Sequence, residues 1–262
     1  MLMAVILCCT AHPDDESMRL GPCLALASDL GHRVIVASAT RGEEGSTGNP
    51  PLCDKAEVGE VRMDELIAAC RHLGASARWL GFRDQELSTL APGVLAETYA
   101  RQLRRFRPDA VLTFPAGGIS GHLDHLAVCR GVLQAYADTY NIALSPQATG
   151  LDAPVRPEPG IRLGPPLPAL YFDVLTPERA ARERRPAPAA SDARYNITIK
   201  AEGGVERAWA ALREHRTQRL WVEHVLGDFG PDARADLASV HLWRVDQGSG
   251  RPGIEDWLAV DG

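Results

Sequence analysis

Short apolar runs alternate with segments of helical periodicity along most of the chain. Residues 3–9 form a continuous apolar run, which is typical of a strand covered on both faces by helices. Further strand candidates are residues 33–39, 77–82, 109–115, 170–174, 196–199 and 241–245. Because helical segments separate most of these runs, the pattern predicts a mostly parallel sheet with right-handed crossovers. We therefore expect a Rossmann-like α/β fold with helices flanking the sheet.

The helical segments are residues 17–30, 57–73 and 95–106, one that follows residue 125 and ends near residue 140, and 204–225. Glycines at 31 and 74 are typical stops for the first two. In the segment 57–73, one side of the helix is an apolar stripe made of Val58, Leu66, Ala69, Cys70 and Leu73. Arg62 falls inside this stripe, so its guanidinium must either reach outward to solvent or point into a polar pocket.

The size and composition fit one domain. The chain has 262 residues, of which 45% are hydrophobic and 24% charged, enough for one large α/β domain and few for two. Periodicity is lost in a Pro- and Gly-rich stretch at 145–168 and again at 182–190. We expect a surface excursion at the first and a mobile loop at the second, within a single domain over residues 1–262.

Charge narrows the class of partner. The formal net charge is −6, which argues against nucleic acid or an anionic membrane and favours a small polar molecule such as a sugar. The apolar start is too short to span a bilayer and lacks the features of a signal peptide. The six cysteines include no C-x-x-C pair and lie in apolar segments. Reduced, buried thiols in a cytoplasmic protein are the expectation.

Two polar clusters follow predicted strands. A-H-P-D-D-E occupies residues 11–16 after the first strand, and G-H-L-D-H occupies 121–125 after the fourth. Because the carboxyl ends of parallel strands meet at one edge of a sheet, we expect both clusters to form one composite site there. Taken singly, each has a plainer interpretation: acidic residues favour the first turn of a helix, and the histidines of a loop are often merely solvated.

Together the two clusters favour a catalytic metal site. Two imidazoles and a carboxylate are common ligands of catalytic zinc, with a further position left for water. Pro13 stiffens the turn after His12, so that His12 and Asp15 could reach one ion while Asp14 points elsewhere. Asp14 would then be free to take a proton from water that the metal acidifies.

These residues resemble the PIG-L/LmbE-like N-acetylglucosamine deacetylases. The resemblance rests on A-H-P-D-D-E, on T-R-G-E-E-G at 40–45, on R-M-D-E-L at 62–66 and on G-H-L-D-H, and it is convincing from the start to about residue 140. It implies that zinc, or another divalent metal, is bound by His12, Asp15 and His125. It also implies an oxyanion-stabilising or amine-protonating role for His122, and Asp14 as the general base.

The resemblance assigns further roles with open alternatives. Asp124 would hold an imidazole in its working tautomer. Arg62, Asp84 and Glu44 would grip substrate hydroxyls, although Arg62 could instead pair with Asp84 for structure, and Glu44 could be a solvated loop acid.

The chain departs from the family pattern in two places. Ser120 stands where some relatives carry a tyrosine, and Leu123 replaces the usual proline between the histidines. His215, in H-R-T-Q, matches a C-terminal family signature, and we interpret it as structural or interface-forming.

The implied activity is hydrolysis of the acetamide of an N-acetylglucosamine-containing small molecule, for instance a precursor of a low-molecular-weight thiol. Rival hypotheses are an amidase acting on thiol conjugates and a non-catalytic metal-binding protein. A nucleotide-binding oxidoreductase is disfavoured because no G-x-G-x-x-G follows the first strand. The expected partners are an amino-sugar substrate and neither nucleic acid nor a membrane, and the family is compatible with a homo-oligomer.

Overall fold

A computed structural model describes residues 3–158, 167–227, 230–246 and 252–258. The fold is one seven-stranded sheet in the order β3-β2-β1-β4-β5-β7-β6. The strands are β1 Val5–Thr10, β2 Arg33–Ser38, β3 Ala75–Trp79, β4 Ala110–Thr113, β5 Ala169–Asp173, β6 Ile197–Lys200 and β7 Ser239–Arg244. Neighbours from β3 to β5 pair in parallel, whereas β7 pairs antiparallel with both β5 and β6. The expected mostly parallel α/β sheet is confirmed.

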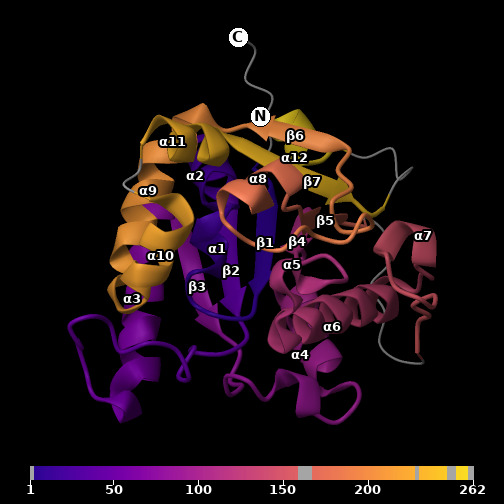
Figure 1. Cartoon of the computed structure of the whole chain (residues 1–262). Helices are drawn as coiled ribbons and strands as arrows, with labels where there is room; N and C mark the ends of the chain where they lie inside the picture. The colour runs from indigo at the N-terminus through magenta and orange to yellow at the C-terminus, as the bar shows by residue number, and fades with distance from the viewer. Residues whose placement is uncertain (1–2, 159–166, 228–229, 247–251, 259–262) are drawn as a thin grey trace.

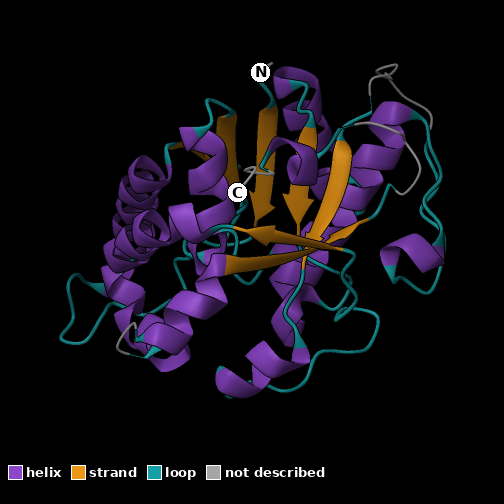
Figure 2. Cartoon of the chain, turned by 90° about the horizontal axis from the view of Figure 1, so that it is seen from above, coloured by secondary structure: helices purple, strands orange, loops and turns teal. Residues whose placement is uncertain are grey.

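Helices cover both faces of the sheet (Figures 1 and 2). The α-helices are α1 Asp15–Met18, α2 Gly21–Asp29, α3 Val58–Leu73, α4 Val94–Phe106, α5 Gly118–Gly121, α6 Leu123–Tyr140, α7 Pro146–Thr149, α8 Pro177–Arg182, α9 Val205–Glu214, α10 Arg219–Leu226, α11 Pro231–Ala238 and α12 Ile254–Trp257. The short 3₁₀ helices are η1 Lys55–Glu57, η2 Leu87–Thr89, η3 Glu202–Gly204 and η4 Arg216–Gln218. In Figure 1, α3 and α9 lie on one side of the sheet and α4 and α6 on the other.

The alternation of side chains along β1 explains why the run is apolar throughout. Ile6 and Cys8 belong to the core beneath α2, α3 and α9. Leu7 and Cys9 belong to the core beneath α4 and α6. A central parallel strand buries both of its faces, so every position must be apolar. This places the end of β1 in the middle of the sheet edge, where the histidine motif begins.

Two predicted helices are broken in the structure. The segment 17–30 is divided into α1 and α2, because Pro22 near the start of α2 has no N–H with which to continue the earlier turn. The segment 204–225 is divided into α9, η4 and α10 at His215, whose backbone ψ of 59° is not helical. The third strand also begins and ends earlier than predicted, at Ala75 and Trp79.

The two irregular stretches are more ordered than their composition indicates. Within 145–168, the helix α7 forms and the buried Val155 pairs with Leu144 in an isolated bridge; residues 159–166 lie outside the described residues. Within 182–190, Glu183 is buried and forms ion pairs with two arginines. The expectation of a mobile loop there is wrong at its start, because a buried charge must be held by partners.

All six cysteines are free, and all except Cys53 are buried, as predicted. Burial raises the pKa of the Cys9 thiol well above its ordinary value, so this group is a small hydrophobe rather than a nucleophile. Among the described residues, no helix is both long enough and apolar enough to cross a membrane.

Candidate metal centre and active site

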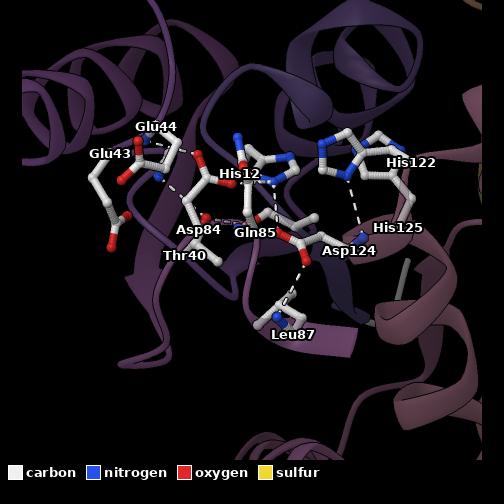
Figure 3. A network of polar contacts seen from close by, with 12 residues as sticks. His12, Thr40, Glu43, Glu44, Asp84, Gln85, Leu87, His122, Asp124 and His125 are labelled. Atoms are coloured by element: carbon white, nitrogen blue, oxygen red, sulfur yellow. Dashed lines mark hydrogen bonds and ion pairs between the residues drawn. The ribbon is translucent and has the colours of Figure 1, made fainter. Parts of the chain in front are cut away.

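The carboxyl ends of β1 and β4 bring the two histidine motifs together. His12 lies just beyond β1, and His122 and His125 lie at the start of α6, beyond β4. Because β1 and β4 are adjacent and parallel, their ends open on the same edge. The ring centroid of His12 is 5.3 Å from that of His125 and 4.8 Å from that of His122, and Figure 3 shows the three imidazoles gathered there.

Asp15 lies between His12 and His125. Its Oδ1 is 3.2 Å from Nε2 of His125, and its Oδ2 is 3.7 Å from Nδ1 of His12. Oδ2 also accepts hydrogen bonds from the backbone N–H groups of Ala11 and His12. Burial opposes ionisation, but the contacts with His125 and His12 prevail and hold the pKa of Asp15 well below its usual range. Asp15 is therefore an ionised carboxylate shared by two imidazoles.

The surroundings of His125 fix its proton. Its Nδ1 lies 3.0 Å from the carbonyl oxygen of Gly118, and because a carbonyl only accepts, Nδ1 must donate. The lone pair of Nε2 in the neutral ring then faces the Asp15 carboxylate. Two acceptors at 3.2 Å require a cation between them, either a proton or a metal ion. The ring also stacks on Phe114 at a centroid distance of 4.1 Å, which restricts its orientation.

His12 has a complementary arrangement. Its Nε2 lies 2.9 Å from Oδ1 of Asp84 and 3.3 Å from Oδ2 of Asp124, so this nitrogen carries the proton and Nδ1 faces Asp15. Burial lowers the pKa of His12, but the hydrogen bonds to Asp124 and Asp84 outweigh it and raise the pKa to about 10. The site therefore stabilises positive charge at His12.

The neutral ring of His122 has the same tautomer as His12, and the opposite one to His125. As the N-cap of α6, its Nδ1 accepts the backbone N–H of Asp124 at 3.2 Å, so the neutral ring carries its proton on Nε2. Burial, together with the neighbouring His12 and His125, lowers the pKa of His122. The ring is therefore neutral at pH 7 and offers an N–H donor rather than a lone pair.

Asp124 joins α6 to the loop after β3. It is fully buried, its Oδ2 accepts the backbone N–H of Gln85 at 2.7 Å, and its Oδ1 accepts that of Leu87 at 3.2 Å. Figure 3 shows these contacts beneath His12. The imidazole that Asp124 contacts through its carboxylate is that of His12.

Asp14 lies next to Asp15 but faces Arg62, with Oδ2 3.2 Å from Nη2. Its backbone φ of 108° lies in the left-handed region, which is strained for a residue with a side chain. Burial raises the pKa of Asp14 to about 6, while Arg62 acts in the opposite direction. A carboxylate with a pKa near neutrality is suited to act as a general base.

Arg62 supports the loop that carries Asp14. It is buried, and its guanidinium donates to the carbonyl oxygens of Gly42 at 2.7 Å and Pro13 at 2.5 Å. The charge within the apolar stripe of α3 therefore points into a polar pocket. Gly42, with a φ of +64°, leaves the space in which the guanidinium lies.

Asp84 and Glu44 occupy different environments. Burial opposes ionisation of Asp84, but its hydrogen bond to His12 lowers its pKa to about 2. Its other oxygen accepts the backbone N–H of Glu44. Among the described residues, Arg62 does not form an ion pair with Asp84; it pairs with Asp14 instead. Glu44 is exposed at the rim, 3.4 Å from Nζ of Lys55.

The H-R-T-Q segment contacts the residues that hold the first histidine motif and helix α3. Nε2 of the fully buried His215 lies 2.9 Å from Oε1 of Glu16, and Oε2 of Glu16 accepts the backbone N–H of Asp14. Both backbone N–H and side-chain hydroxyl of Thr217 donate to Glu65 on α3. His215 is thus structural in this protein, as one of the two interpretations held.

A cavity of about 370 Å³ opens over the centre, a size typical of small-molecule pockets. It is lined by His12, Asp14, Asp15, Arg62 and Asp84 together with His122, His125 and Glu44. Ser120 also lines it. Arg19, Arg185, Gln218 and Trp221 line it as well. Gln218 is the last residue of H-R-T-Q, and the sequence patterns single out none of the other three side chains.

The donors at the centre fit zinc. Two imidazole nitrogens whose lone pairs are available to a metal when the rings are neutral, and one carboxylate, each oriented by an outer hydrogen bond, are typical of catalytic zinc. Distances alone group other described residues too: His12, His122 and His125, whose ligand atoms lie within 4.8 Å of one another, and His12, Asp84 and Asp124. We favour Asp15 over His122, because Nδ1 of His122 is already occupied by a backbone N–H.

Several known proteins are similar to this chain in sequence. The family model described as GlcNAc-PI de-N-acetylase (PIG-L) matches residues 7–136. A 1D-myo-inositol 2-acetamido-2-deoxy-alpha-D-glucopyranoside deacetylase of Nakamurella multipartita is 30% identical over 286 residues, covering 97% of this chain and 93% of the relative. A mycothiol S-conjugate amidase of Streptomyces coelicolor is 33% identical but covers 49% of this chain and 51% of the relative.

Solved structures support the fold. GalB, the 4-carboxy-2-hydroxymuconate hydratase from Pseudomonas putida KT2440, superposes with a TM-score of 0.64 at 19% identity, covering 92% of this chain and 95% of that one. At this identity the similarity concerns the fold alone. Fold, site and relatives together define a metal-dependent N-deacetylase. The chain belongs to the PIG-L/LmbE-like family of GlcNAc-PI de-N-acetylases.

Proposed function

We propose that the protein hydrolyses the acetamide of an N-acetylglucosaminide and releases acetate and the free sugar amine, with zinc held by His12, Asp15 and His125. The observation that carries the proposal is the position of one ionised carboxylate, Asp15, between two imidazole nitrogens that face it and that would offer lone pairs to a metal ion in place of protons. Bound zinc supplies Lewis acidity for the amide carbonyl and for water.

The protein side chains would handle the protons. Asp14 accepts a proton from the attacking water, for which its pKa of about 6 is suited. Water adds to the carbonyl carbon, and the Nε2–H of the neutral His122 donates to the negative oxygen that develops there. The C–N bond then breaks as the amine takes up the proton that Asp14 accepted, and the products are acetate and the amine.

Asp84 and Asp124 would act through His12. Both carboxylates contact Nε2 of His12, so they hold the ring with Nδ1 toward Asp15. Arg62 similarly holds Asp14. We therefore propose that Arg62 and Asp84 mainly position other side chains. Both also line the cavity, where they would contact substrate hydroxyls as a second role. Glu44 would contact the substrate from the rim of the cavity.

The relatives indicate the substrate class. The Nakamurella relative is named for an acetylated glucosaminyl inositol, and we infer a soluble N-acetylglucosaminide of this general kind, in the cytoplasm, as the substrate here. A low-molecular-weight thiol precursor is the finer proposal. An amidase acting on thiol conjugates is the second candidate, and the similarity to the Streptomyces amidase is what favours it.

Zinc content and product release test the proposal together. The purified protein should contain about one zinc per chain and should release acetate from N-acetylglucosaminides. An Asp14→Ala variant should keep the zinc and lose most of the activity. Release of a conjugated acid without any release of acetate would favour the amidase, and wild-type rates in the Asp14→Ala variant would refute the role of Asp14.

A further inference from the structure

Two arginines that the proposed chemistry does not use line the same cavity as the metal centre. Arg19 follows α1, and Arg185 follows α8, so they come from distant parts of the chain. Both are largely buried, with 5% and 13% of the side chain exposed. Burying a guanidinium is costly unless its charge is compensated, so their surroundings decide what these residues do.

The buried cluster around these arginines has more cations than anions. Arg19 donates through Nε to Asp173 at 2.7 Å. Glu183 is shared by Arg179, at 2.7 Å, and Arg185, at 3.0 Å. Three guanidinium groups thus meet two carboxylates. One positive charge is left without a matching carboxylate inside the cluster.

The uncompensated charge belongs to groups that face the cavity. All three nitrogens of Arg179 have acceptors, namely Glu183 and the carbonyl oxygens of Asp236 and Met18, so its donors are satisfied. By contrast, Arg19 donates only through Nε, to Asp173, and Nε of Arg185 lies 3.0 Å from Glu183 as an ion pair without a hydrogen bond, among the described residues. Their terminal N–H groups are the donors left for a ligand.

The orientation of Arg185 is fixed by an aromatic ring. Its Cζ lies 4.6 Å from the ring centroid of Trp221 on α10, which also lines the cavity. Stacking holds the guanidinium plane while leaving the N–H groups at its edge available for oxyanions. Of the acidic side chains of the cavity, Asp14 is engaged by Arg62, and Asp15, whose negative charge also acts on Arg19 and Arg185, is engaged by His125.

We propose that Arg19 and Arg185 form an anion-binding subsite beside the metal centre, and that the preferred substrate carries a carboxylate or phosphate on its aglycone. This inference rests on the proposed deacetylation and names the substrate class within it. It differs from what the name of the Nakamurella relative implies, because inositol is uncharged.

A series of substrates that differ only in the charged group of the aglycone measures how much that charge contributes to recognition. The zinc-loaded enzyme is assayed with three N-acetylglucosaminides whose aglycones end in hydroxyl, carboxylate or phosphate. Charge-assisted hydrogen bonds predict a kcat/KM about ten- to a hundredfold higher for at least one anionic substrate than for the hydroxyl one. The stronger of the two anions identifies the natural group. Equal kcat/KM for all three would overturn the subsite.

Variants test whether Arg185 is the cause. Arg185→Gln should reduce the ratio of anionic to neutral kcat/KM toward unity, and Arg185→Lys should restore part of it. The control is Arg182→Gln on α8, which pairs with Asp236 and does not line this cavity, and which should keep the wild-type ratio. An equal loss on all three substrates in Arg185→Gln would show a merely structural role and refute the proposal.

Two further measurements keep the proposal independent of how the variants fold. In the unaltered enzyme, the preference for the anionic substrate should weaken as sodium chloride is raised; a preference that salt leaves unchanged would contradict it. Binding of the three corresponding amines is measured by calorimetry. Tighter binding of the anionic amines without any deacetylation would refute the proposed function and support the subsite. Deacetylation without a preference for anionic substrates would support the proposed function and refute the subsite.

Discussion

Oδ1 of Asp15 lies 3.2 Å from Nε2 of His125, a nitrogen whose lone pair is directed at the carboxylate because the other ring nitrogen donates to Gly118. Such a contact is favourable only with a cation between the two atoms. The same carboxylate faces Nδ1 of His12 on its other side. The proposed metal ligands follow from these proton positions more than from proximity, since His122 is equally close.

Loss of one imidazole should distinguish a ligand from a donor. His125→Ala should lose both zinc and activity, because only two protein ligands remain. His122→Ala should keep its zinc and lose about 10²–10³ in kcat, the usual cost of losing one oxyanion donor. Metal analysis after dialysis and steady-state assays measure the two effects. Zinc loss in His122→Ala would instead favour the three-imidazole set.

Asp14→Asn should retain zinc and the fold while kcat falls by about 10²–10⁴, the range that general bases contribute. The amide keeps the shape of the side chain and a contact with Arg62 but cannot accept the proton. The matched control is Glu44→Gln at the exposed rim, for which a much smaller loss is expected. Comparable losses in the two variants would mean that Asp14 has no special role.

The buried pair of His215 and Glu16 should make stability depend on pH. Burial lowers the pKa of His215, but the charge of Glu16 and its hydrogen bond prevail and raise it. Because the folded pKa exceeds the unfolded value of ~6.5, the stabilisation is fully present below that pH and is lost as pH rises through the folded pKa. The free energy of unfolding, measured with urea between pH 6 and pH 9, should show this decline.

Replacing this histidine should be costly. His215→Ala leaves Glu16 as an unpaired buried charge, and a loss of about 3–5 kcal/mol in the free energy of unfolding is expected. His72 forms a similar pair with Glu214 but is exposed, so His72→Ala should cost about 0–1 kcal/mol. Equal effects of the two substitutions would show that burial of the His215 pair is unimportant.

Gly42→Ala should impair activity through Arg62. Gly42 has a φ of +64°, and a methyl group there would overlap the guanidinium of Arg62, which holds Asp14. Gly93 has a φ of +84° with open space around it. Gly93→Ala therefore measures the backbone strain alone, about 1 kcal/mol, and should leave kcat unchanged. If both variants kept full activity, the support of Asp14 by Arg62 would be dispensable.

Local sequence patterns were sufficient to predict the mostly parallel sheet and to predict that the two histidine motifs lie together at its edge. The continuous apolar run that became β1 indicates a central strand, and the position of His12 just after it places the histidine at the sheet edge. The resemblance then proposed ligand roles, which the proton positions support and which remain to be tested by experiment.

The remaining features depend on contacts that no local pattern records. The break at His215 arises because its side chain reaches Glu16, far away in the sequence. Arg185 lies in a stretch that composition marks as a loose loop, yet Glu183 and Trp221 hold it in the cavity. Of these long-range contacts, only that of Arg62 could be anticipated from the sequence, because a charge inside an apolar helix stripe requires a buried partner.

The position of the metal can be observed directly. Crystals of the zinc-loaded protein, with diffraction data recorded on both sides of the zinc absorption edge, would locate the ion by anomalous scattering. We predict one peak about 2.0–2.2 Å from Nδ1 of His12, a carboxylate oxygen of Asp15 and Nε2 of His125, with His122 outside coordination distance. A peak bound by Nε2 of His12 together with Asp84 and Asp124, or no peak between the histidines, would contradict it.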